Sequence, residues 1–220
     1  MTSTPRSETT ERPAAPRQER SRDKLERVLA ATDALLCERL FEDIAMADIA
    51  AKAGVAVGTI YTRFRKKDDL LPALFARHDE SVAATVGAFL EGLGRKRRLR
   101  ARIEGIVNFA VDYHLQHRGL LRALTMYVRA HPDSVPAKTF QEREGQYRAV
   151  GQAVVGDGRG ILHKDPLQAV EFALALLNSV CREQLLFDEV SPLREHRSNL
   201  AAFKRRLTDT IHRDLAARVR

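Results

Sequence analysis

Residues 45–67, AMADIAAKAGVAVGTIYTRFRKK, decide the fold of this chain. Met46 and Ile49 recur at helical spacing with small apolar residues after them, which indicates one short helix with a single apolar face. Gly54 readily takes a positive φ and can end that helix. A second helix over about 57–64 would follow at once. The stretch therefore predicts a helix-turn-helix, although an ordinary corner between two helices would give the same pattern.

The second of these helices has an outward face suited to the major groove of DNA. Small and hydroxyl-bearing side chains, one tyrosine and one arginine occupy it. A cationic segment follows, and we expect Lys67, at the start of the next helix, to share a DNA phosphate with free backbone N–H groups. A solvated run of charges is the alternative interpretation. The candidate DNA-binding residues are Val57, Gly58, Thr59, Tyr61, Thr62, Arg63, Lys66 and Lys67.

Residues 48–71, DIAAKAGVAVGTIYTRFRKKDDLL, resemble the signature of the TetR family (TetR/AcrR type) of one-component transcriptional regulators. The resemblance covers about residues 22–82. It implies an all-α fold, with an N-terminal three-helix DNA-binding domain and a C-terminal helical domain for ligand binding and dimerisation. The positions that match the family pattern are Asp48, Ile49, Ala50, Ala53, Gly54, Val55, Gly58, Thr59, Ile60, Tyr61, Phe64, Lys67 and Leu70.

The chain departs from that pattern where hydroxyl side chains usually begin the two motif helices. Ile44, Ala45 and Ala56 stand at those places. Losing an N-cap hydroxyl costs about 1 kcal/mol and removes one phosphate ligand. Asp43 is the alternative cap for the first helix. In the second helix, Thr62 and the arginine after it replace the family's more common aromatic–histidine pair.

The composition favours a helical protein with a polyanionic partner. The 220 residues are 44% hydrophobic but only 6% aromatic, and the net charge is +8 with a pI of about 9.9. Alanine, leucine, arginine and glutamate dominate, as in helical proteins. Cys37 and Cys181 are predicted to be buried and reduced. No apolar run of ~18 residues or signal peptide is present, so we expect a cytoplasmic protein.

Three regions are predicted along the chain. Residues 1–20 indicate a disordered leader, residues 21–82 the DNA-binding domain, and residues 83–220 the effector-binding and dimerisation domain. The first helix should begin at a capping box of Asp23 and Glu26. Further helices are expected over 70–92, 99–118, 119–130, 135–155, from 165 onward, and over 195–218.

Three segments beyond the motif carry more specific expectations. Leu115 is expected in the buried stripe of its helix. The basic run from Arg95 to Arg102 indicates a solvated loop and helix face. The glycine-rich segment 156–160, GDGRG, is a turn only, because it lacks the Lys-Ser/Thr of a P-loop and follows no strand.

Residues 170–180 are apolar almost all round, so a helix there must be covered on both sides. We expect a second copy of the chain to cover one side. The last helix carries an apolar stripe with basic flanks, and the pair resembles the helices of the family's dimeric four-helix interface. A homodimer would read a palindromic operator with two recognition helices.

The family resemblance also implies a pocket for a small hydrophobic effector in the C-terminal domain. Polar and aromatic residues interrupt its apolar helices, as in ligand pockets; ordinary core or surface positions are the alternative for each of them. His114, in the predicted helix 99–118, and Phe140, in the predicted helix 135–155, belong to the same group of polar and aromatic residues. The candidate pocket residues are Asn108, Tyr113, His117, Met126, Tyr127, Tyr147, Asn178 and Cys181.

No catalytic or cofactor motif is present, so the sequence predicts neither an enzyme nor a cofactor. His114 and His117 lie three residues apart but have no cysteine or carboxylate at ligand spacing, which argues against a metal site. The sequence thus predicts a dimeric transcriptional repressor that a small molecule releases from its operator. The alternative is a DNA-binding regulator whose C-terminal domain only dimerises.

Overall fold

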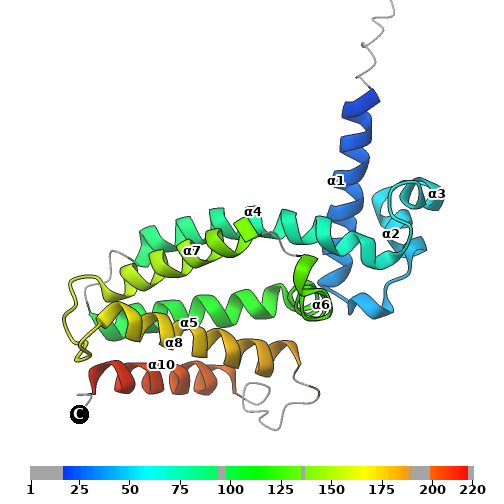
Figure 1. Cartoon of the computed structure of the whole chain (residues 1–220). Helices are drawn as coiled ribbons and strands as arrows, with labels where there is room; N and C mark the ends of the chain where they lie inside the picture. The colour runs from blue at the N-terminus through cyan, green and yellow to red at the C-terminus, as the bar shows by residue number, and fades with distance from the viewer. Residues whose placement is uncertain (1–16, 94–97, 135–136, 188, 190–198, 218–220) are drawn as a thin grey trace, which may run out of the picture.

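The computed structural model describes residues 17–93, 98–134, 137–187, 189 and 199–217, and every regular element within them is helical, as predicted. Figure 1 shows the N-terminal helices gathered at one end of a longer body of helices. The α-helices are α1 Arg17–Leu36, α2 Met46–Ala53, α3 Val57–Tyr61, α4 Leu70–Leu93, α5 Leu99–Gln116, α6 Arg118–Ala130, α7 Ala137–Val155, α8 Pro166–Cys181 and α10 Leu200–Ala216. The short 3-10 turns η1 Phe41–Asp43, η2 Lys67–Asp69 and η3 Pro132–Ser134 and the π-helix η4 Arg182–Leu186 connect them.

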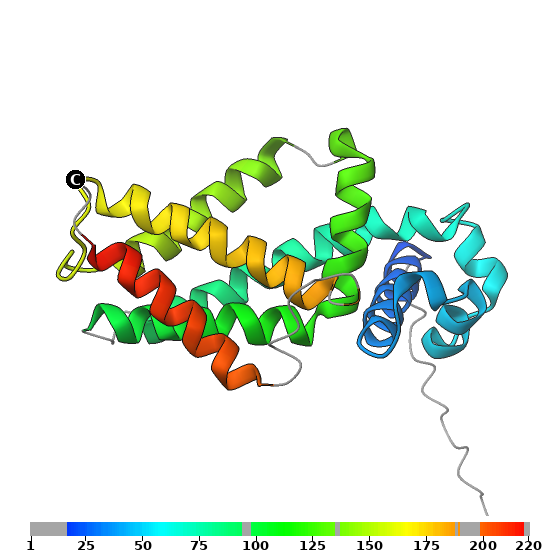
Figure 2. The same cartoon turned by 90° about the horizontal axis from the view of Figure 1, so that it is seen from below.

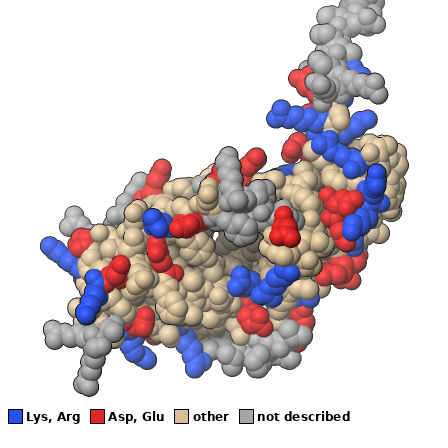
Figure 3. Space-filling view, viewed as in Figure 1, with Lys and Arg blue, Asp and Glu red and all other residues tan. Residues whose placement is uncertain are grey.

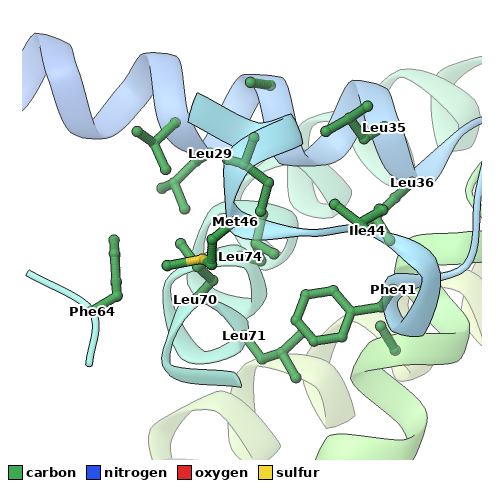
Figure 4. Close-up of a cluster of buried hydrophobic side chains, with 14 of the residues drawn as sticks. Leu29, Leu35, Leu36, Phe41, Ile44, Met46, Phe64, Leu70, Leu71 and Leu74 are labelled. Atoms are coloured by element: carbon green, nitrogen blue, oxygen red, sulfur yellow. The ribbon is translucent and has the colours of Figure 1, made fainter. Parts of the chain in front are cut away.

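The N-terminal domain has one apolar core, made by α1, α2, α3, the start of α4 and part of α6. Ile44 and Ile49 are almost fully buried in it. Figure 4 shows the Phe41 ring directed toward Leu71 of α4, with Met46 above Leu70. Burying such side chains contributes about 1.5–3 kcal/mol each, so α1, α2 and α3 depend on their packing against α4 for much of their stability.

Helix α4 belongs to two cores. Leu70, Leu74 and Phe75 in its first turns are buried in the N-terminal core. At its other end Leu93 is buried in a second core, with Phe89 packed against it. Figure 1 shows α4 running from the N-terminal domain along the length of the C-terminal domain. A displacement of α4 must therefore disturb both domains.

The second core is centred on α5, with α7, α8 and α10 around it. Ile103 and Val107 of α5 are fully buried and meet apolar side chains of the later helices. Figure 2 shows α8 and α10 side by side on one face of this domain, and the two helices are in contact. The C-terminal domain is thus a layered helical bundle with α8 and α10 at its surface.

Helix α8 begins where its sequence predicts. The Asp165 carboxylate accepts a hydrogen bond from the backbone N–H of Gln168 at 3.0 Å, and Pro166 occupies the first turn, an arrangement that suits a helix start. The apolar side chains Phe172 and Leu176 are 62% and 50% exposed. The described chain therefore covers α8 on one side and leaves an apolar strip on the other.

The first helix begins earlier than the sequence suggests. Helix α1 starts at Arg17, so residues 17–20 are helical and do not belong to a leader; residues 1–16 lie outside the described part. Asp23 and Glu26 fall inside the helix and form no capping box. The residues upstream supply strong helix formers, arginine and glutamate, and these extend the helix without an apolar stripe.

Three side chains lie differently from their prediction. Cys37 is exposed just beyond the end of α1, whereas Cys181 is buried as expected. Leu115, in the last turn of α5, is 37% exposed and does not belong to the buried stripe. Arg102 is only 4% exposed and lies 3.5 Å from the Asp157 carboxylate, so the basic run does not stay solvated throughout.

Residues 94–97, within the predicted basic run and at the end of the preceding helix, lie outside the described part. Helix α7 is described from Ala137, and α10 begins at Leu200, later than predicted. Among the described residues, no helix combines the length and the apolar character needed to cross a membrane.

Candidate DNA-binding surface and ligand pocket

The turn between α2 and α3 has the predicted geometry. Gly54 follows α2 with φ 64° and ψ 40°, the left-handed conformation, which a side chain would strain. Ala50 of α2 and Ile60 of α3 belong to the same core and are 1% and 2% exposed, and Val55 packs against that core. The small side chain of Ala50 allows α3 to cross α2 closely, and the segment forms a helix-turn-helix.

Helix α3 presents the predicted outward face. Val57 is 36% exposed and Tyr61 50% exposed; Gly58 and Arg63 are also exposed, while Thr59 is half-buried. The helix ends at Tyr61 rather than near residue 64, and the chain continues in a turn.

Two further predicted residues extend this surface. In the turn after α3, the exposed Thr62 donates its hydroxyl to the carbonyl of Thr59 at 2.7 Å. Lys66 is also exposed. The structure therefore brings seven of the eight predicted residues to one exposed turn-and-helix surface.

The start of α2 is capped from inside the helix. The Asp48 carboxylate accepts a hydrogen bond from the backbone N–H of Ala45 at 3.0 Å and pairs with Arg39 at 3.1 Å. The backbone hydrogen bond, followed by Arg39, lowers the pKa of Asp48 below its usual value. Asp43 does not cap this helix, contrary to its suggested role. Ala56 before α3 provides no side-chain cap, as predicted.

Lys67 has a different role from the one predicted. Its ammonium group donates to the carbonyls of Phe41, Glu42 and Ile44 at 2.6, 3.1 and 2.9 Å. It also lies 4.7 Å from the centre of the Phe41 ring. An ammonium group has three hydrogens to donate, and all three are used within the protein. Lys67 therefore fixes the η1 turn against the start of α4 and leaves no donor for a DNA phosphate.

Charge at this end of the molecule is mixed. Figure 3 shows lysine and arginine side chains along α1 and the neighbouring helices, with acidic side chains between them. Several are paired across helices, such as Lys52 with Glu38 at 3.4 Å and Arg77 with Glu26 at 3.5 Å. Exposed pairs of this kind contribute about 0–1 kcal/mol, so their cations remain available to polyanions.

A cavity of about 290 Å³ lies in the C-terminal domain, between α4, α5, α6, α7 and α8. We call it the central cavity. Figure 3 shows the surface hollowed near the middle of this face. Its volume is near the lower end of the range for small-molecule pockets, about 300–1,000 Å³. Its walls comprise His78, Asp79, Val82, Val86, Ile106, Phe109, Ala110, Tyr113, His114, Leu121, Thr125, Gln146, Tyr147, Val150, Leu174, Leu177, Asn178, Arg182 and Leu186.

Three of the eight predicted pocket residues line the central cavity: Tyr113, Tyr147 and Asn178. The Asn178 amide contacts the Tyr147 hydroxyl, and it donates to the carbonyl of Leu174 at 3.4 Å. His114, which lies on the same helix as Tyr113, also lines it. Its Nδ1 is 2.7 Å from the carbonyl of Ala110, and burial lowers its pKa.

The other five predicted pocket residues lie elsewhere. Asn108 is half-buried on α5 away from the cavity, Met126 is half exposed, and Cys181 is buried in the second core. Tyr127 packs against the N-terminal core and stacks on the His131 ring; its helix, α6, turns that side away from the cavity. The side chain of Phe140 lies outside the described part.

His117, the fifth, lies beside the cavity instead of in its wall. Its ring is 4.5 Å from that of Tyr113, centre to centre, and is tilted against it. Tyr113 in turn contacts His78 of α4, with its hydroxyl 3.3 Å from Nε2. These rings connect the cavity wall to α4 and to the junction between the two domains.

Sequence reasoning missed several cavity residues. His78, Val82 and Val86 recur every four residues on α4 and were indistinguishable from a core stripe. Arg182 lies four residues beyond Asn178, and its backbone N–H donates a hydrogen bond to the Asn178 carbonyl, so the two side chains share a helix face and both line the wall. Among the described residues, no group of three or more potential metal ligands lies close together.

The fold and the exposed recognition surface define a helix-turn-helix DNA-binding protein with a separate C-terminal helical domain. Residues 28–74 match the family model described as bacterial regulatory proteins, tetR family. Residues 28–74 therefore carry a DNA-binding domain of the TetR type, and the chain resembles the DNA-binding transcriptional regulators of that family.

Solved structures with the same fold cover nearly the whole chain. A TetR-family regulator from Mesorhizobium loti is 18% identical with a TM-score of 0.63, covering 90% of this chain and 97% of its own. The fatty acid degradation regulator FadR from Bacillus halodurans is 20% identical with a TM-score of 0.59, covering 86% and 94%. A TetR-family regulator from Marinobacter aquaeolei is 19% identical with a TM-score of 0.55, covering 91% and 100%. No curated protein matches the sequence.

Proposed function

We propose that this protein is a dimeric repressor that leaves its operator when a small molecule enters the central cavity. The observation that carries the proposal is the position of α4. Leu70 and Leu74 anchor its start in the DNA-binding core, whereas His78, Val82 and Val86 line the cavity one to four turns later. A ligand that prefers a displaced α4 would move the DNA-binding domain by differential affinity for the two states.

The central cavity supports an effector over a purely dimerising C-terminal domain. A domain that only dimerises would be expected to fill its interior with side chains. Here apolar walls enclose about 290 Å³, and a few polar groups project among them. That combination is typical of pockets for small, largely apolar ligands.

The exposed strip on α8 supports a homodimer through α8 and α10. Phe172 and Leu176 share one helix face. Phe172 is more than half exposed and Leu176 is half exposed. The two helices lie together on the same face of the domain (Figure 2). A two-fold axis at this face would place two α3 helices on one DNA duplex, and the operator would be a palindrome.

Seven residues are proposed to contact DNA, and they divide into two roles. Thr59 and its neighbours on α3 would read base edges, whereas Tyr61 and Lys66 would bind phosphates. Thr59→Val should then change the preferred sequence, while Tyr61→Phe should weaken binding to all sequences alike. The proposed contacts are Val57, Gly58, Thr59, Tyr61, Thr62, Arg63 and Lys66.

Selection from a random DNA library at moderate salt tests the proposal. Recovery of one palindromic motif is the expected result, and that motif then serves as the probe for release by small molecules. Binding that yields no motif and disappears as salt rises would contradict sequence-specific regulation, because only phosphate contacts behave in that way. Equal, uniform losses for Thr59→Val and Tyr61→Phe would contradict the division of roles.

A further inference from the structure

The central cavity carries its unpaired charge at Arg182, the residue that follows α8. Asn178 and Arg182 are four residues apart and share a helix face, and both line the cavity. The Arg182 side chain is partly buried there. Within the described residues it has neither a hydrogen bond nor an ion pair, unlike Arg122, which contacts Glu189 near the same turn. An arginine turned into an apolar cavity without a carboxylate is a binding group for an anion.

The other charged wall residue, Asp79, forms no ion pair with Arg182. Asp79, on α4, lines the cavity and interacts with another residue of the protein. It is therefore not a free counter-ion for an incoming cation. The remaining polar walls supply the uncharged groups Thr125 and Gln146 together with the Tyr147–Asn178 pair.

His114 adds an acceptor beside this cation. Burial lowers its pKa, and the positive charge of Arg182 acts in the same direction, so the ring is neutral near pH 7. Its Nδ1 faces the carbonyl of Ala110 and must donate to it, which leaves Nε2 as an acceptor. A neutral histidine does not compete with Arg182 for an anion.

We propose that the effector is an amphipathic monocarboxylate, with its carboxylate on the Arg182 guanidinium and its apolar body against the walls of the central cavity. One guanidinium can bind one carboxylate through two parallel hydrogen bonds. A phosphate dianion would call for further cations, and the described wall offers no second unpaired one. The apolar body packs on side chains such as Val86, Ile106 and Leu177. This inference rests on the proposed function only in naming the cavity as the effector site.

Calorimetric titration of the full-length protein with matched probes tests the assignment. Octanoate, 1-octanol and octylamine share one body and differ in charge at the head, and 3-phenylpropionate extends the set to an aromatic acid. The expected order of affinity is carboxylate, then alcohol, then amine. Arg182→Gln should weaken octanoate binding about 10- to 100-fold, as for loss of a charge-assisted hydrogen bond, and should leave 1-octanol nearly unchanged.

Two further variants make the test specific. Arg129→Gln removes the same charge from an exposed position of α6 away from the cavity, so its octanoate affinity should match that of the unaltered protein. Arg182→Lys keeps the charge but loses the planar fork and should retain an intermediate affinity. Circular dichroism of each variant verifies its helical fold. Should Arg182→Gln fail to fold, the probe series on the unaltered protein and Arg182→Lys still decides.

Three results would overturn the inference. These are octylamine binding as tightly as octanoate, equal octanoate affinity in Arg182→Gln and the unaltered protein, or equal losses in Arg129→Gln and Arg182→Gln. The proposed function is tested by a separate outcome. If octanoate binds through Arg182 but the protein stays bound to its operator, release by the ligand is refuted and the carboxylate site is supported. If only the alcohol or the amine released the protein from its operator, that result would support release by a ligand and refute the carboxylate site.

Discussion

Replacing Lys67 by alanine should destabilise the DNA-binding domain. The Lys67 ammonium binds three carbonyls of the segment between α1 and α2, and two of them, those of Phe41 and Ile44, are partly buried. Each such bond contributes about 1 kcal/mol net, and the contact with the Phe41 ring adds about 0.5–1 kcal/mol. The third carbonyl is exposed, where water can replace the lysine. Lys67→Ala should therefore lower the free energy of unfolding by about 2–3 kcal/mol.

Thermal unfolding followed by far-ultraviolet circular dichroism measures this effect. A loss of that size in a chain of 220 residues corresponds to a fall in Tm of about 4–12 °C. Lys66→Ala is the matched control, because Lys66 is adjacent, equally charged and exposed. It should change stability by less than about 0.5 kcal/mol and should lower the salt slope of DNA binding by about one.

The reverse pattern would refute this reasoning. If Lys67→Ala unfolded at the same temperature as the unaltered protein and lost one unit of salt slope, Lys67 would be a phosphate ligand. The three carbonyl contacts would then be a resting arrangement that DNA displaces. Such a result would restore the role expected from the sequence.

Three further predictions concern a glycine pair, a helix cap and the cysteines. Gly119→Ala should lower the Tm by several degrees, because its Cβ would lie 2.1 Å from a main-chain oxygen of α1; Gly58→Ala, with open space around it, should keep the Tm and weaken DNA binding. Asp48→Asn should destabilise the protein at pH 7, because a carboxylate with a lowered pKa stabilises the fold above its unfolded value of 3.8. Denaturation at several pH values should show that difference shrinking as the pH falls below about 4 through the lower folded pKa. Iodoacetamide at pH 8 should label Cys37 but not Cys181, whose pKa burial raises to about 12, and mass spectrometry should show a second label only in urea; two labels in the folded protein would contradict the buried position.

Some of the candidate site follows from local sequence alone. The outward face of α3 needs only the 3.6-residue period and a glycine to end α2, and both lie within about twenty residues. The cavity is different, because its wall combines Val86 of α4, His114 of α5 and Arg182 beyond α8. Periodicity marks each of these positions as inward or outward on its own helix, but it does not say which helices face each other.

The sequence by itself determined the all-helical architecture, the helix-turn-helix and the start of α8 at Asp165, because each depends on propensity, spacing and caps within a few residues. Tertiary structure alone decided the role of Lys67, whose partners lie 23–26 residues away. It also decided which residues enclose the central cavity and that Arg102 is buried. These features arise when helices distant in the chain pack together, and the energy of that packing depends on the neighbours that each side chain acquires only in the fold.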